Sequence, residues 1–287
     1  IVEYREGPMA AVSIVEDTDG VSRLRINNRQ QEGSSATLLA DARQALLPLL
    51  LHPAPQRVLF LGLGTGMTAS AAAADPSLQV DAVELLPEVI AASAHFRRAA
   101  GADAPNPRLH LLAADARRHV KTTPQRYDVV IADNFHPARS GSGSLYTVEH
   151  FDAVKRVLGE QGLFCQWLPL HQLDLDTLRS IVRSFVAVYP GARAMLATNS
   201  LETPVLGLVA MGRGVDLARL HERLATTTLP QRLADYGLAD EYALAGSFVA
   251  GPAALQQFAG DAPLNTDDHP VVAYRAPRVT YAPDSLP

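Results

Sequence analysis

The sequence is poor in cysteine, basic charge and long hydrophobic runs, and each shortage excludes a class of protein. Cys165 is the single cysteine among 287 residues, which excludes a disulfide framework and a cysteine-based metal site. No apolar run reaches the roughly 18 residues that a membrane span needs, and the best one, residues 59–74, is interrupted by Gly62, Gly64 and Gly66. A net charge of -5 provides no basic surface for nucleic acid, so we expect no nucleic-acid partner.

The composition is that of a globular protein. The chain is 47% hydrophobic and 19% charged, and its length is sufficient to bury a large core. It begins with Ile1 and not with Met, so we expect an N-terminus that is cut or processed. We expect a cytoplasmic protein, tethered to the membrane in its full-length form if a membrane module precedes Ile1.

Residues 1–53 differ in pattern from the rest of the chain. Two short β-rich runs, 11–16 and 23–27, lie on either side of Asp19-Gly20, a dipeptide typical of tight hairpins. Residues 38–51 then carry leucines and alanines near helical spacing. The pattern predicts an N-terminal β-hairpin unit and a linking helix. A hairpin of this size is not stable alone, so we expect it to pack on the main domain or to pair across a homodimer.

From residue 57 onward, strand-like and helix-like segments alternate. Strands that are apolar throughout and alternate with helices are typical of a parallel sheet covered by helices on both faces. We expect the main domain over residues 54–215, with residues 216–287 forming a C-terminal helical segment and the final strand of the same domain. The expected strands are 57–61, 79–83, 109–112, 127–132, 162–168, 192–197, 205–211 and 271–274, and the expected helices include 147–158, 174–188 and 217–238.

Three glycines mark the turn between the first of these strands and its helix. Gly62, Gly64 and Gly66 allow the backbone to turn sharply and let a ligand approach without a Cβ in the way. Their spacing is G-x-G-x-G, whereas the dinucleotide fingerprint G-x-G-x-x-G would need its third glycine at Met67. The spacing therefore disfavours NAD and leaves the turn as a candidate site for another nucleotide.

Acidic residues follow the predicted strands at the same edge of the sheet. Glu84 ends the second strand, 20 residues beyond Gly64, where a carboxylate can accept hydrogen bonds from both ribose hydroxyls. Asp115 follows the third strand, where it can accept a hydrogen bond from an adenine amino group, and Asp133 follows the fourth. Ligands of open α/β sheets bind outside the carboxyl ends of the strands, so these residues together predict a nucleoside site.

In order and sequence, these motifs resemble the spermidine synthase (aminopropyltransferase) family over most of residues 20–170. The run 24–31 resembles the family's L-x-L-D-G-x-x-Q, in which the Gln contacts the nucleoside, and the run 127–133 resembles the strand before its catalytic loop. The resemblance implies a Rossmann-like α/β fold of the S-adenosylmethionine-dependent transferases, with a doubly wound, mostly parallel sheet. It also implies a homodimer, no metal, and S-adenosylmethionine or its decarboxylated form as co-substrate. The residues that it assigns to the nucleotide are Gln31, Gly62, Gly64, Thr65, Gly66, Glu84, Asp115 and Ala116.

The sequence departs from the family at the positions that hold the amine. The family's glycine turn reads G-G-G-D-G, and Thr65 stands at the Asp position. Its Y-H-E stretch aligns with Ala40-Asp41-Ala42, which leaves Asp41 as a candidate substrate contact. Tyr146 is a second candidate, although an aromatic that starts a helix more often serves packing.

The catalytic loop is also altered. The family reads D-S-x-D-P, in which the second Asp receives the amine's proton, whereas this chain reads Asp133-Asn-Phe-His136-Pro137. A histidine has a reference pKa of about 6.5, which suits proton acceptance, so Asp133 and His136 are the candidate catalytic residues. The alternative is that His136 only shapes the turn. Residues 141–144 form a candidate mobile loop or a flexible linker.

Other features indicate a divergent bacterial branch of the family. The motifs at 136–141, 145–147, 166–170 and 264–270 resemble this branch, many members of which carry an N-terminal membrane-spanning region. Within the last motif, Asp267-Asp268-His269 has the composition of a metal site but lacks partner ligands, so we expect a turn or an amine contact.

Three functions remain open from the sequence. The first is aminopropyl transfer to a polyamine-type amine, which the Gln31 motif and the N-terminal β unit favour. The second is methyl transfer from intact S-adenosylmethionine, which Thr65 favours because a carboxylate there would repel the methionine carboxylate. The third is a non-catalytic nucleotide-binding module, which the altered catalytic loop keeps open.

Overall fold

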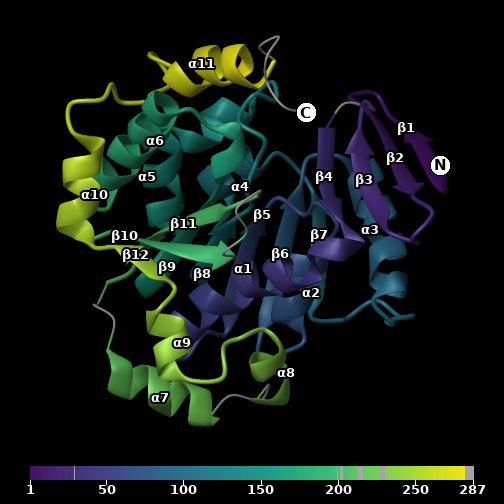
Figure 1. Cartoon of the computed structure of the whole chain (residues 1–287), viewed down its shortest axis with the longest axis horizontal. Coiled ribbons are helices and arrows are strands. Elements are labelled where there is room, and N and C mark those ends of the chain that lie inside the picture. The colour runs from purple at the N-terminus through teal and green to yellow at the C-terminus, as the bar shows by residue number, and fades with distance from the viewer. Residues whose placement is uncertain (29, 199, 201–202, 213–215, 227–229, 282–287) are drawn as a thin grey trace.

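The protein is built around two β-sheets that lie side by side (Figure 1). The computed structural model describes residues 1–28, 30–198, 200, 203–212, 216–226 and 230–281. The smaller sheet is antiparallel, with its strands in chain order: β1 (Glu3–Glu6), β2 (Ala11–Glu16), β3 (Ser22–Ile26) and β4 (Gln30–Ser34). The sequence predicted only β2 and β3, so the N-terminal unit is a four-stranded sheet and not a hairpin. The two missed strands are short and mostly polar, and they carried no apolar signal.

The larger sheet has eight strands in the order β12-β10-β11-β9-β8-β5-β6-β7. The five strands from β9 to β7 are parallel, whereas β11, β10 and β12 add antiparallel pairs at one side. The mostly parallel α/β fold expected from the sequence is confirmed. The bounds are β5 (Arg57–Leu61), β6 (Gln79–Glu84), β7 (Leu109–Ala113), β8 (Tyr127–Ala132), β9 (Leu158–Pro169), β10 (Arg193–Thr198), β11 (Val205–Ala210) and β12 (Phe248–Ala250).

Helices bury apolar residues on both faces of the larger sheet. One buried cluster joins the sheet to α1 (Leu38–Leu51), α2 (Met67–Ala73), α7 (Leu217–Thr226), α8 (Pro230–Asp235) and α9 (Glu241–Ala245). The other joins it to α4 (Ala116–Thr122), α5 (Val148–Val157), α6 (Leu175–Val188), α10 (Pro252–Ala259) and α11 (Val271–Thr280). The central strands are apolar on both sides because both sides are covered.

The smaller sheet rests on the helix α3 (Pro87–Ala99). Val12, Ile14 and Leu24 from its inner face form a separate buried cluster with Val89 and Phe96 of α3. This contact buries the apolar face that a free sheet would expose to water. It also places β4 beside the glycine turn of the larger sheet.

Two expectations for the C-terminal region are wrong. Residues 271–274, expected as the final strand, begin the helix α11, which packs against α6 and buries Val272 and Ala276. The helix expected over 217–238 ends too late: the structure has α7 over Leu217–Thr226 and α8 over Pro230–Asp235, residues 236–238 are not helical, and residues 227–229 lie outside the described part of the chain. Short β-branched runs satisfy both helix and strand patterns, which explains the first error.

Among the described residues, no helix is both long and apolar enough to cross a membrane.

Candidate active site

The glycine turn after β5 has the backbone geometry that only glycine adopts readily. Gly62, Gly64 and Gly66 have φ angles of 91°, 53° and 80°, in the left-handed region. A Cβ on Gly62 would lie 3.0 Å from Cβ of Asp133, and one on Gly64 would lie 3.2 Å from the backbone oxygen of Glu32. The turn is therefore crowded by the loop that follows β8 on one side and by β4 on the other.

A cavity of about 530 Å³ opens above this turn, at the carboxyl edge of the parallel strands. Its volume is in the range of small-molecule sites. Most of the predicted site residues line it: Gln31, Asp41, Gly62, Gly64, Thr65, Glu84, Asp115, Ala116, Asp133 and His136. Two do not. Gly66 instead is the N-cap residue of α2, and Tyr146 is fully buried, with its hydroxyl donating to the backbone oxygen of Phe135 at 2.6 Å.

Glu84 ties the end of β6 to the glycine turn. One carboxylate oxygen accepts a hydrogen bond from the backbone N–H of Leu63 at 3.2 Å, and the other accepts from Leu86 at 3.0 Å. The side chain is 8% exposed, and it faces the cavity. Each oxygen has a second lone pair, which suits a pair of ribose hydroxyls.

Asp115 forms the N-terminal cap of α4. Its Oδ1 accepts a hydrogen bond from the backbone N–H of Arg118 at 2.7 Å, and Ala116 begins the helix. Because the hydrogen bonds of the described residues occupy only Oδ1, Oδ2 is available to a ligand amino group at the cavity wall.

Asp133 and His136 face the cavity from the loop that follows β8. Asp133 is half-buried, and the desolvation of its carboxyl raises its pKa to about 6; the negative charge of Glu84 contributes, and a hydrogen bond from Asn134 opposes the rise. Burial lowers the pKa of His136, and the charges of Arg139 and His171 lower it further. At neutral pH the structure thus places a neutral imidazole near an acid that ionises close to neutrality.

Two further acids bring the cavity's carboxylates together, and one of them was missed in the sequence. Glu32 lines the cavity, and burial raises its pKa to about 7, with contributions from Glu84 and Asp133; an ion pair with Arg139 at 3.5 Å opposes the rise. Burial and the charge of Asp133 raise the pKa of Asp41 to about 7 as well. Glu32 directly follows the Gln31 motif, so only its position beside that motif pointed to it.

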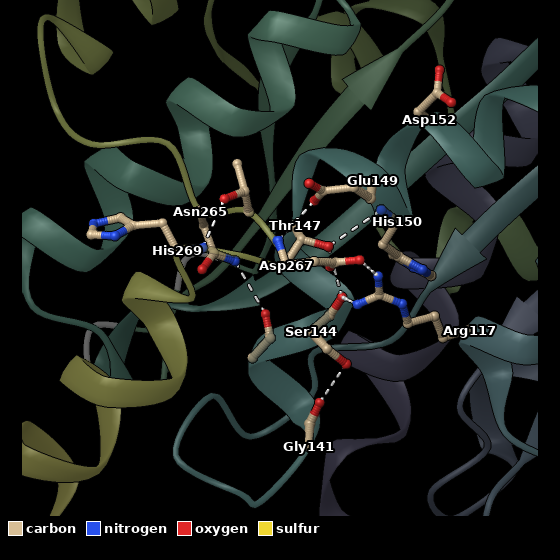
Figure 2. A network of polar contacts seen from close by, with 12 residues as sticks. Arg117, Gly141, Ser144, Thr147, Glu149, His150, Asp152, Asn265, Asp267 and His269 are labelled. Atoms are coloured by element: carbon tan, nitrogen blue, oxygen red, sulfur yellow. Dashed lines mark hydrogen bonds and ion pairs between the residues drawn. The ribbon is translucent and has the colours of Figure 1, made fainter.

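The loop over residues 141–147 is packed and does not behave as a free linker. Residues 142–146 form a 3-10 helix in which Ser142 and Gly143 are buried. Arg117, on the cavity wall, donates to the backbone oxygen of Ser144 and pairs with Asp267 (Figure 2). Asn265 donates to the backbone oxygen of Gly143 at 3.1 Å, so the C-terminal segment holds this loop against the site (Figure 2).

The motif Asp267-Asp268-His269 forms a bend in the backbone, which agrees with the first of its two expected roles. The backbone N–H of Thr266 donates to the oxygen of His269 at 3.1 Å, and Asp267 is engaged by Arg117. Within the described residues, no cluster of three His, Cys, Asp or Glu side chains has the arrangement of a metal site.

The fold and the cavity define a class of protein. A doubly wound sheet with a glycine turn after the first parallel strand, an acid after the second and an acid-lined cavity at the carboxyl edge is the arrangement of Rossmann-like nucleotide-binding domains. A spermine/spermidine synthase domain matches residues 44–200, more than half of the chain, which therefore belongs to the spermine/spermidine synthase family.

Curated relatives of this chain are named polyamine aminopropyltransferases. A polyamine aminopropyltransferase of Methanocaldococcus jannaschii is 29% identical over 182 residues, which are 63% of this chain and 62% of the relative. One of a Ruegeria species is 30% identical over 198 residues, 68% of both chains. The chain thus spans somewhat less than two thirds of the archaeal relative.

Solved structures share the fold at lower identity. Spermidine synthase from Thermotoga maritima has a TM-score of 0.71 at 20% identity, with 90% of this chain and 87% of that one covered. A spermidine synthase in complex with the transition-state analogue AdoDATO gives the same values. A probable spermidine synthase from Corynebacterium glutamicum has a TM-score of 0.66 at 18% identity, covering 93% and 96% of the two chains. These likenesses establish the fold.

Proposed function

We propose that the protein transfers an aminopropyl group from decarboxylated S-adenosylmethionine to a polyamine-type amine. The observation that carries the proposal is the acidic cavity at the glycine turn. Glu32, Asp41 and Asp133 line it, and all three have raised pKa values because they are buried near like charges. A cationic amine would relieve this repulsion on binding, and the membership of the aminopropyltransferase family supports the same reading.

The nucleoside takes the side of the cavity that faces β6 and β7. Glu84 accepts hydrogen bonds from the ribose hydroxyls, and Asp115 accepts one from the adenine amino group through Oδ2. Gln31 reaches the nucleoside from β4, and the open backbone of Gly62 and Gly64 admits the sulfonium end.

The reaction requires the acceptor's nitrogen to lie in line with the bond between the propyl carbon and the sulfonium sulfur. The nitrogen attacks the propyl carbon attached to the sulfonium, a carbon–nitrogen bond forms, and the carbon–sulfur bond breaks with its electrons on sulfur. Methylthioadenosine leaves as a neutral product, so the leaving group needs no acid. The amine nitrogen must lose a proton, which His136 or Asp133 accepts; both face the cavity. The remaining rate enhancement comes from holding the two reactants together in the reactive orientation.

The products of the reaction test the proposal. The protein is offered S-adenosylmethionine and its decarboxylated form, each with a panel of diamines and polyamines, and the nucleoside product is identified by mass spectrometry. Methylthioadenosine with an aminopropylated amine is expected from the decarboxylated form. S-adenosylhomocysteine would assign methyl transfer, the function that Thr65 keeps open, and the absence of turnover with every amine would assign a binding module.

Assembly and location stay predictions from the sequence. We propose a homodimer, as the family plan implies, and a cytoplasmic location, with tethering if a membrane module belongs to the full-length protein. Size-exclusion chromatography with light scattering measures the mass of the particle and decides between a monomer and a dimer.

A further inference from the structure

Glu32 occupies an irregular position in the small sheet. In the pairing of β3 with β4, Arg25 lies opposite Gln31 and Leu24 lies opposite Gly33, so Glu32 is the extra residue of a β-bulge. Successive side chains of a regular strand point to opposite faces. Gln31 and Glu32 nevertheless both line the cavity. The bulge is therefore what turns the Glu32 carboxylate toward the site, and bulges that re-aim a side chain are common beside active sites.

Glu32 lies against the reacting part of the site and not at its rim. Its backbone oxygen would be 3.2 Å from a Cβ on Gly64, and Oδ2 of Asp133 would be 3.5 Å from the same Cβ. The backbone of Glu32, from the small sheet, and the carboxylate of Asp133, from the catalytic loop, thus approach the same glycine. The charges of Asp133 and Glu84 both act on Glu32, and Arg139 is the cation that acts on it.

Arg139 pairs with Glu32 only loosely. Nη1 of Arg139 lies 3.5 Å from Oε1 of Glu32, and that oxygen is shielded from solvent without a hydrogen bond from any described residue. Arg139 comes from the same loop as His136, whose backbone oxygen accepts a hydrogen bond from the Arg139 N–H at 3.0 Å. A carboxylate that is desolvated and only loosely paired is stabilised when a cation comes closer to it.

We propose that Glu32 binds an ammonium group of the acceptor amine, and that Arg139 is its counter-ion in the absence of substrate and is displaced when the amine binds. The inference rests on the proposed function, because it names a contact of that acceptor. It adds a carboxylate from the small sheet to the site, where Asp133 and His136 come from the catalytic loop. It also gives the small sheet a direct part in selecting the acceptor.

Two substitutions of opposite expected effect test the role of Glu32. Glu32→Gln keeps the shape and removes the charge, so the affinity for 1,4-diaminobutane, measured by calorimetry with methylthioadenosine present, should fall about 10- to 150-fold. Arg139→Gln removes the competing cation, so the affinity should rise, by up to about 5-fold. Affinity for methylthioadenosine alone should stay within about twofold in both variants, since neither side chain is assigned to the nucleoside. Glu6→Gln, an exposed acid of the same sheet, is the matched control and should change neither affinity.

The outcomes separate this inference from the proposed function. Unchanged diamine affinity in Glu32→Gln, or weaker binding in Arg139→Gln, would overturn the role of Glu32 while the wild-type product assay still stands. A folding defect would lower the affinity of both variants for the diamine and for the nucleoside. Lower diamine affinity in one variant and higher diamine affinity in the other would therefore exclude such a defect. If the wild-type protein binds no diamine or polyamine, the inference fails together with the proposed acceptor.

Discussion

Glu84 lies where a strand, the glycine turn and the cavity meet, so we expect its charge to contribute to both binding and stability. Replacing it by Gln should weaken the binding of methylthioadenosine about 10- to 150-fold, because hydrogen bonds to a charged acceptor contribute roughly 1.5–3 kcal/mol. The melting temperature should fall as well, since the N–H groups of Leu63 and Leu86 lose a charged acceptor. Calorimetry and thermal unfolding measure the two effects.

The control for this substitution is Asp103→Asn, a change of the same kind at an exposed loop residue that does not line the cavity. It should leave both the affinity and the melting temperature unchanged. A Glu84→Gln variant that binds the nucleoside as tightly as the wild-type protein would remove Glu84 from the site.

His136 and Asp133 should differ in their effect on the pH–rate profile. A base must be deprotonated to act, and the pKa of His136 is lowered while that of Asp133 is raised to about 6. The rate should therefore rise between about pH 5 and pH 7 and then level off. His136→Ala should reduce kcat by on the order of 10²-fold and remove the limb that belongs to the imidazole.

Nucleoside affinity should stay nearly constant in this variant, which separates a loss of chemistry from a loss of binding. Asp133→Asn should reduce kcat by a similar factor and leave the imidazole limb in place. Full activity of His136→Ala across the pH range would leave Asp133 as the proton acceptor.

At the scale of elements, the helix α11 supports the loop that forms part of the cavity wall. A Cβ on Gly143 would lie 2.8 Å from the backbone nitrogen of Ala273 in α11, and backbone atoms cannot move aside cheaply. Gly143→Ala should therefore push the loop away from α11 and cost about 1–3 kcal/mol of the free energy of unfolding. Because Ser142 and Ser144 line the cavity, kcat/KM should fall too.

Gly191→Ala is the matched comparison, since nothing lies within 4 Å of the added methyl group and no left-handed φ is involved. Its stability and kcat/KM should equal those of the wild-type protein. Chemical denaturation and steady-state kinetics on both variants make the comparison. Equal values in Gly143→Ala would show that the loop and α11 are not coupled.

The elements that the sequence predicted well are those with a strong local signal. The apolar strands β5 and β8 and the helix α1 all match the structure. The pattern failed where the signal was short: β1 and β4 are mostly polar, and the run of valines that begins α11 satisfied a strand pattern. Tertiary packing decided those cases.

The candidate site was predictable where residues follow strands in the chain. Gly64, Glu84, Asp115 and Asp133 lie at successive strand ends, and parallel strands bring those ends to one edge, where all four line one cavity. Glu32 was not predictable, because its direction depends on a bulge that no local pattern reveals. The tie between Arg117 and Asp267, residues far apart in the chain, could not be read from the sequence either.

At the scale of the whole molecule, the site is assembled from three parts of the chain. The small sheet contributes Gln31 and Glu32, the carboxyl edge of the large sheet contributes most of the remaining residues, and the C-terminal segment holds the loop in place. The acids that line this cavity repel one another only in the folded state, so they lower its stability. The same acids form the proposed amine site, which links function to stability.

The raised pKa values of these acids make the folded protein's stability depend on pH. Asp41 has a pKa of about 7 when folded and an ordinary value near 3.8 when unfolded, so between these values the folded state binds the extra proton. Stability due to Asp41 therefore falls as the pH rises from about 4 to about 7. Asp41→Asn removes this penalty, and the variant should melt higher than the wild-type protein at pH 8, by about 2–4 °C for each kcal/mol relieved.

The advantage of Asp41→Asn should be smaller at pH 5, where the wild-type carboxyl is largely protonated in the folded state. Buried histidines whose pKa values are lowered, such as His150 with a pKa of about 3, act in the opposite direction, because they favour the folded state as the pH rises. The wild-type protein and the Asp41→Asn variant both contain these histidines, so their effect cancels in the difference between the two melting temperatures. Comparing the two proteins at each pH therefore isolates the contribution of Asp41. Differential scanning fluorimetry from pH 5 to pH 8 measures it. A difference in melting temperature that is constant across this range would mean that the Asp41 carboxyl does not titrate there, and would contradict a folded-state pKa of about 7.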